Sequence, residues 1–91
     1  MELKNKNITI GELGEERKFV SGTKNWRIDF AELNGNRFEK GVKVKFDDLD
    51  DDEEYIGLVN WIIVTEQGDV EVSFDAPLGR VDLEDLEIVT S

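Results

Sequence analysis

The chain has 91 residues and a formal net charge of −11, and it contains neither cysteine nor histidine. Disulfides and thiolate zinc sites are therefore excluded, as are the usual general base and pH switch of proteins. The length predicts one domain over residues 1–91, and 38% hydrophobic content is typical of a globular protein. The sequence lacks an apolar run of about 18 residues and the apolar stretch of a signal peptide. We therefore expect a cytoplasmic protein without a membrane partner.

The first half of the chain offers one helix signal and one hairpin signal. Thr9 and Glu12 have the spacing of a capping box, which predicts a short helix from about Ile10 to Arg17. Asn34-Gly35 is a strong hairpin signal because both residues accept a positive φ. It predicts pairing between a strand at 26–30 and a strand at 37–46, with a bulge or bend at Gly41.

The segment 55–64, YIGLVNWIIV, is the most hydrophobic part of the chain. Strict alternation would place two apolar sets on opposite faces: Ile56, Leu58, Ile62 and Val64 on one, and Tyr55, Val59, Trp61 and Ile63 on the other. A strand that is apolar on both faces must be covered twice, and Gly57 predicts a sharp bend in it. Either the N-terminal helix or a second subunit must cover the second face. Because one short helix covers little of it, we expect a homodimer, and the candidate contact residues are Tyr55, Val59 and Trp61.

The remaining segments also favour β-structure. Val70 to Phe74 alternates, Ala76 to Gly79 is a turn signal, and Leu83 to Leu86 is typical of one helical turn before a short strand at 87–89. The fold class expected is mainly β, a twisted antiparallel sheet or small barrel of about five strands, with a short N-terminal helix.

Charge is distributed very unevenly. Residues 1–45 carry a net charge of +3 and residues 46–91 a net charge of −14, and seven of the eight residues from Asp47 to Glu54 are acidic. Alternating and apolar segments flank this run, so a β-hairpin with a negatively charged tip in solvent is the simplest structure. The asymmetry indicates either a partner or a mimicked surface, and the alternative is that the acids serve solubility alone.

Duplex DNA offers a physical template for such a surface. Side chains two apart on a strand lie about 6.5–7 Å apart, close to twice the roughly 3.4 Å phosphate rise of one DNA strand. A cleft lined with Lys and Arg would accept a matching row of carboxylates as it accepts phosphates. The candidate phosphate-mimicking residues are Asp47, Asp48, Asp50, Asp51, Asp52, Glu53, Glu54, Asp69, Glu71, Asp75, Asp82, Glu84, Asp85 and Glu87.

The sequence gives less support for a calcium site or a catalytic site. Asp48, Asp50 and Asp52 match the first ligands of an EF-hand loop, but Glu53 and Val59 stand where it needs Gly and Glu. Weak, non-specific cation binding by the run is what remains. No nucleophile–base set, P-loop or dinucleotide fingerprint is present, so we expect no enzyme activity, no cofactor and no metal site.

Two resemblances add to these patterns. The segments GVKVKF at 41–46, YIGLV at 55–59, GDVEVSF at 68–74 and DLEIV at 85–89 have a rhythm that resembles small SH3-like barrels of the KOW and Tudor kind. Those families place a one-turn helix before the last strand and bind nucleic acids or peptides. The length, the acidity, the start KNKNITIGELGEE and the end DLEDLEIV are similar to the Arn-like phage anti-restriction proteins, which act as DNA mimics against a restriction nuclease.

Two functions from different classes follow. The first is an acidic DNA mimic, phage-encoded and acting in the host cytoplasm, that blocks a restriction endonuclease. Its partner would be a basic DNA-binding protein, and it would not bind nucleic acid directly. The alternative is an SH3-like interaction module that binds a basic peptide or nucleic acid through the less acidic N-terminal half.

Overall fold

The computed structural model describes residues 2–76 and 79–90. Within them the chain forms short strands and one 3₁₀ turn. In chain order these are β1 (Thr9–Ile10), β2 (Glu16–Lys18), β3 (Lys24–Ile28), β4 (Phe30–Leu33), β5 (Asn36–Glu39), β6 (Lys43–Asp48), β7 (Glu53–Thr65), β8 (Val70–Phe74), β9 (Val81–Asp82), η1 (Leu83–Asp85) and β10 (Leu86–Ile88). The expected mainly β fold is confirmed, and every pairing between these strands is antiparallel. These residues contain no helix with the length and apolar character that a membrane crossing needs.

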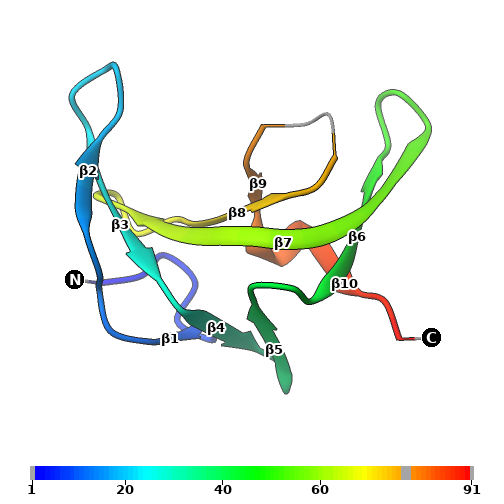
Figure 1. Ribbon diagram of the computed structural model, residues 1–91, viewed down its shortest axis with the longest axis horizontal. Helices are drawn as coiled ribbons and strands as arrows, with labels where there is room; N and C mark the ends of the chain where they lie inside the picture. The colour runs from blue at the N-terminus through cyan, green and yellow to red at the C-terminus, as the bar shows by residue number, and fades with distance from the viewer. Residues whose placement is uncertain (1, 77–78, 91) are drawn as a thin grey trace.

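The long strand β7 organises the larger sheet, which has the order β10-β6-β7-β3-β2. The first half of β7 pairs with β6, and its second half pairs with β3 and β8, while β9 extends the sheet beyond β8. A second sheet, β1-β4-β5, packs beneath it (Figure 1). The β2–β3 hairpin and the β6–β7 hairpin lie at opposite ends of the longest axis and turn toward the same side, so the larger sheet is strongly curved (Figure 1).

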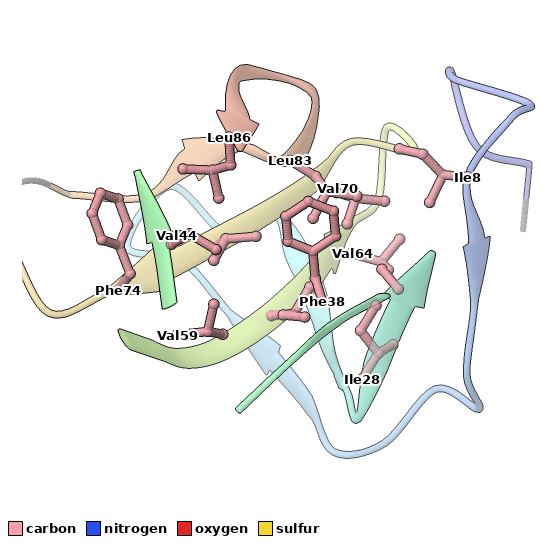
Figure 2. Close-up of a cluster of buried hydrophobic side chains, with 13 residues drawn as sticks. Ile8, Ile28, Phe38, Val44, Val59, Val64, Val70, Phe74, Leu83 and Leu86 are labelled. Atoms are coloured by element: carbon pink, nitrogen blue, oxygen red, sulfur yellow. The ribbon is translucent and has the colours of Figure 1, made fainter. Parts of the chain in front are cut away.

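The core lies between the two sheets. Thirteen buried side chains form one cluster, to which nearly every strand contributes (Figure 2). Phe38 of β5 is 2% exposed and joins the small sheet to Val59 and Val64 of β7. Leu83 of η1 is fully buried in the same cluster, which explains why a helical turn interrupts the chain between β9 and β10.

A β-bulge in β7 changes which of its side chains face this core. Val59 pairs with Phe74, but the next pair joins Trp61 to Ser73, so Asn60 is the extra residue. Because one inserted residue reverses the alternation, Val59 before the bulge and Ile62 after it both point inward. The sequence-based faces were therefore wrong: Ile56 and Leu58 are 46% and 49% exposed, whereas Val59 and Ile62 are each 1% exposed.

The predicted N-terminal helix was also wrong. Residues 11–15 run extended beside β3 and β4, with the amide of Gly11 donating to Phe30 O at 3.1 Å and that of Gly14 donating to Arg27 O at 2.6 Å. A Cβ atom at Gly14 would lie 2.9 Å from the Arg27 carbonyl oxygen, so glycine permits this close approach. The two glycines that weaken a helix are thus the residues that let the segment pair as a strand.

The small closed barrel was a wrong prediction as well, and the structure has more than the five or so strands expected. Among residues 2–76 and 79–90, β10 pairs with β6 and β2 pairs with β3, and no pairing closes the sheet between them. Other local predictions are confirmed. Asn34 and Gly35 take φ values of 53° and 82° in the β4–β5 hairpin, and Gly41 takes 91° in the turn that separates β5 from β6. The predicted strand partners were wrong, because this hairpin joins β4 to β5, whereas most of the strand expected at 26–30 belongs to β3, which pairs with β7. The predicted turn at Ala76–Gly79 includes Pro77 and Leu78, which lie outside the described residues.

Gly57 lies within β7, at a point where the backbone of another segment comes very close. A Cβ atom at this position would overlap the backbone carbonyl of Asp75, whose amide donates to Leu58 O at 2.9 Å. The sequence predicted a sharp bend at Gly57 and did not anticipate this close backbone contact. The reason is the approach of the segment after β8 to the middle of β7.

The bulge yields a first prediction. Ile62→Ala should lower the free energy of unfolding by roughly 2–5 kcal/mol, because it removes buried methyl groups and leaves a cavity. The matched control is Ile56→Ala on the same strand, which removes the same atoms from a half-exposed side chain and should cost less than about 1 kcal/mol. Urea unfolding measures both. Equal losses at the two positions would contradict the bulge and restore strict alternation along β7.

Candidate binding surfaces

The β6–β7 hairpin carries most of the acidic run at its tip, here called the acidic tip and defined as residues 47–54. Asp48 shapes it, because its Oδ1 accepts hydrogen bonds from the amides of Asp50 at 3.1 Å and Asp51 at 3.4 Å. Asp52 closes the turn with a φ of 54°, which aspartate tolerates better than most residues. Leu49 is 90% exposed at the apex. The turn is therefore built by local side-chain chemistry, and its carboxylates project into solvent.

A second group of acids lies where β8, β9 and η1 meet. Burial raises the pKa of Asp82, and the neighbouring carboxylates of Asp85 and Asp69 raise it further against the opposing effect of Lys4. Burial also raises the pKa of Glu84, followed by repulsion from Asp82, Asp85 and Asp69. Asp69 and Asp85 are thus close enough to Asp82 and Glu84 to oppose the ionisation of these two acids.

A hollow of about 500 Å³ connects the two groups. Its lining combines Asp47, Asp48 and Asp50 of the tip with Asp85 of η1, and it includes the apolar side chains of Phe46 and Leu49. Glu87 of β10 joins the same region, because Lys45 Nζ lies 3.7 Å from a carboxylate oxygen of Glu87 and 3.7 Å from one of Glu54. We call the whole surface the acidic band: Asp47, Asp48, Asp50, Asp51, Asp52, Glu53, Glu54, Asp69, Asp82, Glu84, Asp85 and Glu87.

Few cations neutralise this band. Within the described residues, Lys45 and Lys4 are its ion-pair partners, Lys4 lying 3.1 Å from Asp69. Glu53 accepts a hydrogen bond of 2.8 Å from the Tyr55 hydroxyl, which raises the pKa of that tyrosine. No three carboxylates of residues 2–76 and 79–90 converge so as to hold a metal ion. The acids of the band are close enough to repel one another but spread over a surface.

Two of the predicted phosphate mimics lie apart from the band. Glu71 points to the outer face of β8, where its Oε1 accepts a 2.9 Å hydrogen bond from Arg80, so its charge is compensated. Asp75 is exposed just after β8 beside Gly57. The expected row of Asp69, Glu71 and Asp75 along one strand is therefore interrupted by an arginine.

The outer face of β7 is covered by the chain itself over half its length. Ile63 and Thr65 are buried there, although both point away from the core between the sheets. Over the other half, Ile56, Leu58 and Trp61 remain exposed, with Lys43 and Lys45 opposite Leu58 and Ile56 on β6. No helix among the described residues supplies the cover that was predicted for this face.

Of the three predicted dimer contacts, the structure rules out one. Val59 is 1% exposed, because the bulge turns it into the core, so it is unable to touch a partner. Tyr55 is half-buried and packs against the core from its edge. Trp61 is 39% exposed on the outer face and stays a candidate contact.

At the end opposite the acidic tip, cations and aromatic rings line a groove of about 210 Å³. We call it the basic groove and define it by the residues Arg17, Lys18, Phe19, Arg27, Trp61 and Arg80. The Arg27 guanidinium lies 4.7 Å from the centre of the Trp61 ring, and that of Arg80 lies 4.2 Å from the Phe19 ring. Arg17, Arg27 and Trp61 also line an adjoining hollow of about 250 Å³.

Sequence reasoning missed this groove. Its residues come from β2, the loop after it, β3, β7 and the segment before β9, and of these only Arg17, Lys18 and Phe19 are consecutive in the sequence. The only available signal was the excess of lysine and arginine in residues 1–45. Strand pairing between β3 and β7 brings Arg27 to Trp61, and that pairing could not be read from the chain.

No protein-family model matches the chain, and neither a curated protein nor a solved structure matches it. The resemblances to Arn-like anti-restriction proteins and to SH3-like families therefore stay predictions. The functions of the acidic band and of the basic groove therefore have to be inferred from their charges and their geometry.

The raised pKa values of Asp82 and Glu84 give a second prediction. An acid whose folded-state pKa lies above its unfolded value favours folding when it is protonated, so the contribution of these two acids to stability should rise as the pH falls from 7 toward their ordinary values of 3.8 and 4.5, and should be lost again as the pH is raised. Thermal melting should show the dependence.

The variant that tests the cause is Asp82→Asn with Glu84→Gln, which should be more stable at pH 7 and less sensitive to pH. Its control is Glu12→Gln with Glu16→Gln, which removes two exposed acids outside the band. If both double variants retain the same pH dependence, local repulsion around η1 is not its source.

Proposed function

We propose that the protein is an acidic DNA mimic that occupies the DNA-binding cleft of a basic protein, with a host restriction endonuclease as the expected target. The observation that carries the proposal is the continuity of the acidic band from the hairpin tip, across the hollow at Asp85, to Asp82, Glu84 and Asp69. A cleft that follows duplex DNA needs negative charge over an extended path, and a single acidic loop would supply it at only one point.

The sparse neutralisation of the band supports the same function. Asp50, Asp51, Asp52 and Asp85 have no ion-pair partner within the described residues, so their charges remain available to a partner's lysines and arginines. Acids kept for solubility would gain stability by pairing with nearby lysines, as Glu32 and Glu39 do with Arg37 at 3.1 and 3.0 Å. Uncompensated like charges cost stability, which is common where charge serves binding.

The mechanism is competition by charge. Binding places carboxylates where a nuclease expects phosphates and releases the counterions of both surfaces, so the inhibitor excludes DNA without being cut. Electrostatic attraction also accelerates encounter with a basic cleft. On this account the band itself binds no nucleic acid and requires no cofactor.

A second candidate function rests on the hollow at Phe46, Leu49 and Asp85. A cavity of about 500 Å³ with apolar walls and four carboxylates fits a short basic peptide that inserts one apolar side chain. This keeps the alternative of an interaction module, although on the acidic end and not on the N-terminal half. A free Lys- and Arg-rich peptide would then bind as tightly as an intact DNA-binding domain.

The third prediction tests mimicry at the tip. Asp50→Asn, Asp51→Asn and Asp52→Asn together remove three charges, while Asp48 still accepts the turn's hydrogen bonds and Asn tolerates the positive φ at position 52. The wild-type protein should displace labelled duplex from a restriction endonuclease in a panel, less effectively as salt increases. The triple variant should displace it at least about tenfold less well, a loss of about 1.4 kcal/mol of binding free energy.

The matched control replaces Glu12, Glu16 and Asp29 by their amides. These acids are exposed, lie outside the band and carry no ion pair among the described residues, so the control has the same net charge as the triple variant. It should compete as well as wild type. If both variants displace the duplex equally less well than wild type, overall charge and not the band governs binding. If neither loses displacement, the tip is a solvated loop.

A further inference from the structure

The basic groove is unusual in a protein of net charge −11. Lys18 and Arg27 make no ion pair within the described residues, while Arg17 and Arg80 share their charge with Glu15 at 3.2 Å and Glu71 at 2.9 Å. The groove therefore presents a positive surface at the end of the molecule opposite the acidic tip. Nothing in the DNA-mimic function uses it.

The aromatic rings hold the cations of the groove in place. A guanidinium stacked on an aromatic ring keeps its plane fixed and leaves N–H groups at its edge for an acceptor, so less side-chain entropy is lost on binding. Arg27 on Trp61 and Arg80 on Phe19 are both arranged in this way. Such planar, pre-oriented donors match carboxylates particularly well.

The acidic tip of a second copy has the complementary chemistry. It is a narrow hairpin turn with seven carboxylates and one apolar side chain, Leu49, at its apex. The groove offers cations together with the exposed ring of Trp61, and Val20 is fully exposed in the adjacent turn. Charge and apolar groups on the two surfaces therefore correspond.

The placement of the two surfaces favours a head-to-tail arrangement. The molecule is 33 Å long, and the β2–β3 and β6–β7 hairpins lie at opposite ends of that axis (Figure 1). When the tip of one copy enters the groove of the next, the acidic ends of the two copies stay apart by more than the Debye length of about 8 Å at physiological salt. A symmetric dimer through the tips would instead bring the acidic ends together.

We propose that the basic groove binds the acidic tip of a second copy of this chain, so that the protein self-associates head to tail with Trp61 in the contact. Such a contact is heterologous, and each pair leaves one free tip and one free groove. The groove lies outside the acidic band, whereas the tip belongs to it, so self-association and the proposed DNA mimicry would use the same tip and only the groove variant separates them. It assigns Trp61, but not Tyr55 or Val59, to the contact between copies.

Nucleic acid is the less suitable occupant. Phosphates that extend beyond the groove would meet a protein of net charge −11, and one face of each aromatic ring already carries a guanidinium where a base would stack. A hairpin tip ends within the groove, so its carboxylates do not continue along the rest of this surface as the phosphates of a longer strand would. Binding of single-stranded DNA is therefore an outcome that counts against the proposal.

The experiment combines two variants that each lack one half of the contact. The groove variant is Lys18→Glu with Arg27→Glu, and the tip variant is Asp50→Asn, Asp51→Asn and Asp52→Asn. Sedimentation equilibrium at tens of micromolar should show wild type above the monomer mass of 10.4 kDa and each variant alone as a monomer. An equimolar mixture should form a dimer and nothing larger, because only one intact groove and one intact tip remain per pair.

Each alternative result overturns the proposal. A monomeric wild type, a mixture that stays monomeric, or a groove variant that still assembles would each do so, the last pointing to the exposed Ile56–Leu58 face. Lys18→Glu alone, at an exposed position, replaces the double variant if circular dichroism shows that the latter is unfolded. Fluorescent oligothymidylate binding that is tight in wild type and lost in Lys18→Glu would make the groove a nucleic-acid site.

Two further measurements test this contact: the salt dependence of self-association, and the displacement of DNA from the target by the groove variant. Raising salt from about 0.1 M to about 1 M shortens the Debye length from about 10 Å to about 3 Å and should weaken self-association at least tenfold. If salt acted only by screening repulsion between two negative proteins, it would strengthen association. The groove variant should still displace duplex DNA from the target, so failure here and failure of the DNA-mimic function give different results.

Discussion

The pairing of β7 is the constraint on which the rest of the structure depends. Its first half pairs with β6, its second half pairs with β3 and β8, and the bulge at Asn60 lies between the two halves. Because the bulge reverses the alternation, Val59, Ile62 and Val64 all reach the core, and Trp61 is directed outward to Arg27. The same strand carries the acidic tip at one end and forms the floor of the basic groove at the other. Without the bulge, strict alternation would prevent Val59 and Ile62 from both facing the core while Trp61 faces the groove.

Charge separation along β7 connects this architecture to function. The acidic band gathers a dozen carboxylates, with two lysines as their ion-pair partners among the described residues. Burial, followed by repulsion from neighbouring carboxylates, raises the pKa values of Asp82 and Glu84. A fold selected for stability alone would distribute these charges or pair them. Here the turn is closed by hydrogen bonds to Asp48, so its backbone holds although its side chains repel one another. The hairpin thus provides a rigid support for charge, which a binding surface needs and a solvated tail does not.

The sequence predicted those features that depend on local chemistry. Asn34-Gly35 fixed a hairpin because its φ values are local, and alternation in Val70–Phe74 identified a strand with its correct buried face. The capping-box spacing at Thr9 misled, because two backbone hydrogen bonds to β3 and β4 outweigh a weak helix preference interrupted by glycines. The faces of β7 were misassigned since no residue type marks a bulge. For the site, the acidic tip was visible as a run, whereas the groove required pairing between segments far apart in the chain.

The central claim is that the acidic band stands in for DNA, and affinity capture with competitive elution tests it most directly. The protein is immobilised, exposed to bacterial lysate, and washed with either duplex DNA or polyglutamate at equal charge. On this account the captured proteins are DNA-binding proteins, and duplex DNA releases them at a far lower charge concentration than polyglutamate, because their clefts recognise the spacing of charge and not its sign alone. Equal release by both polymers, or captured proteins that duplex DNA leaves in place, would contradict mimicry and leave a general polyanion surface.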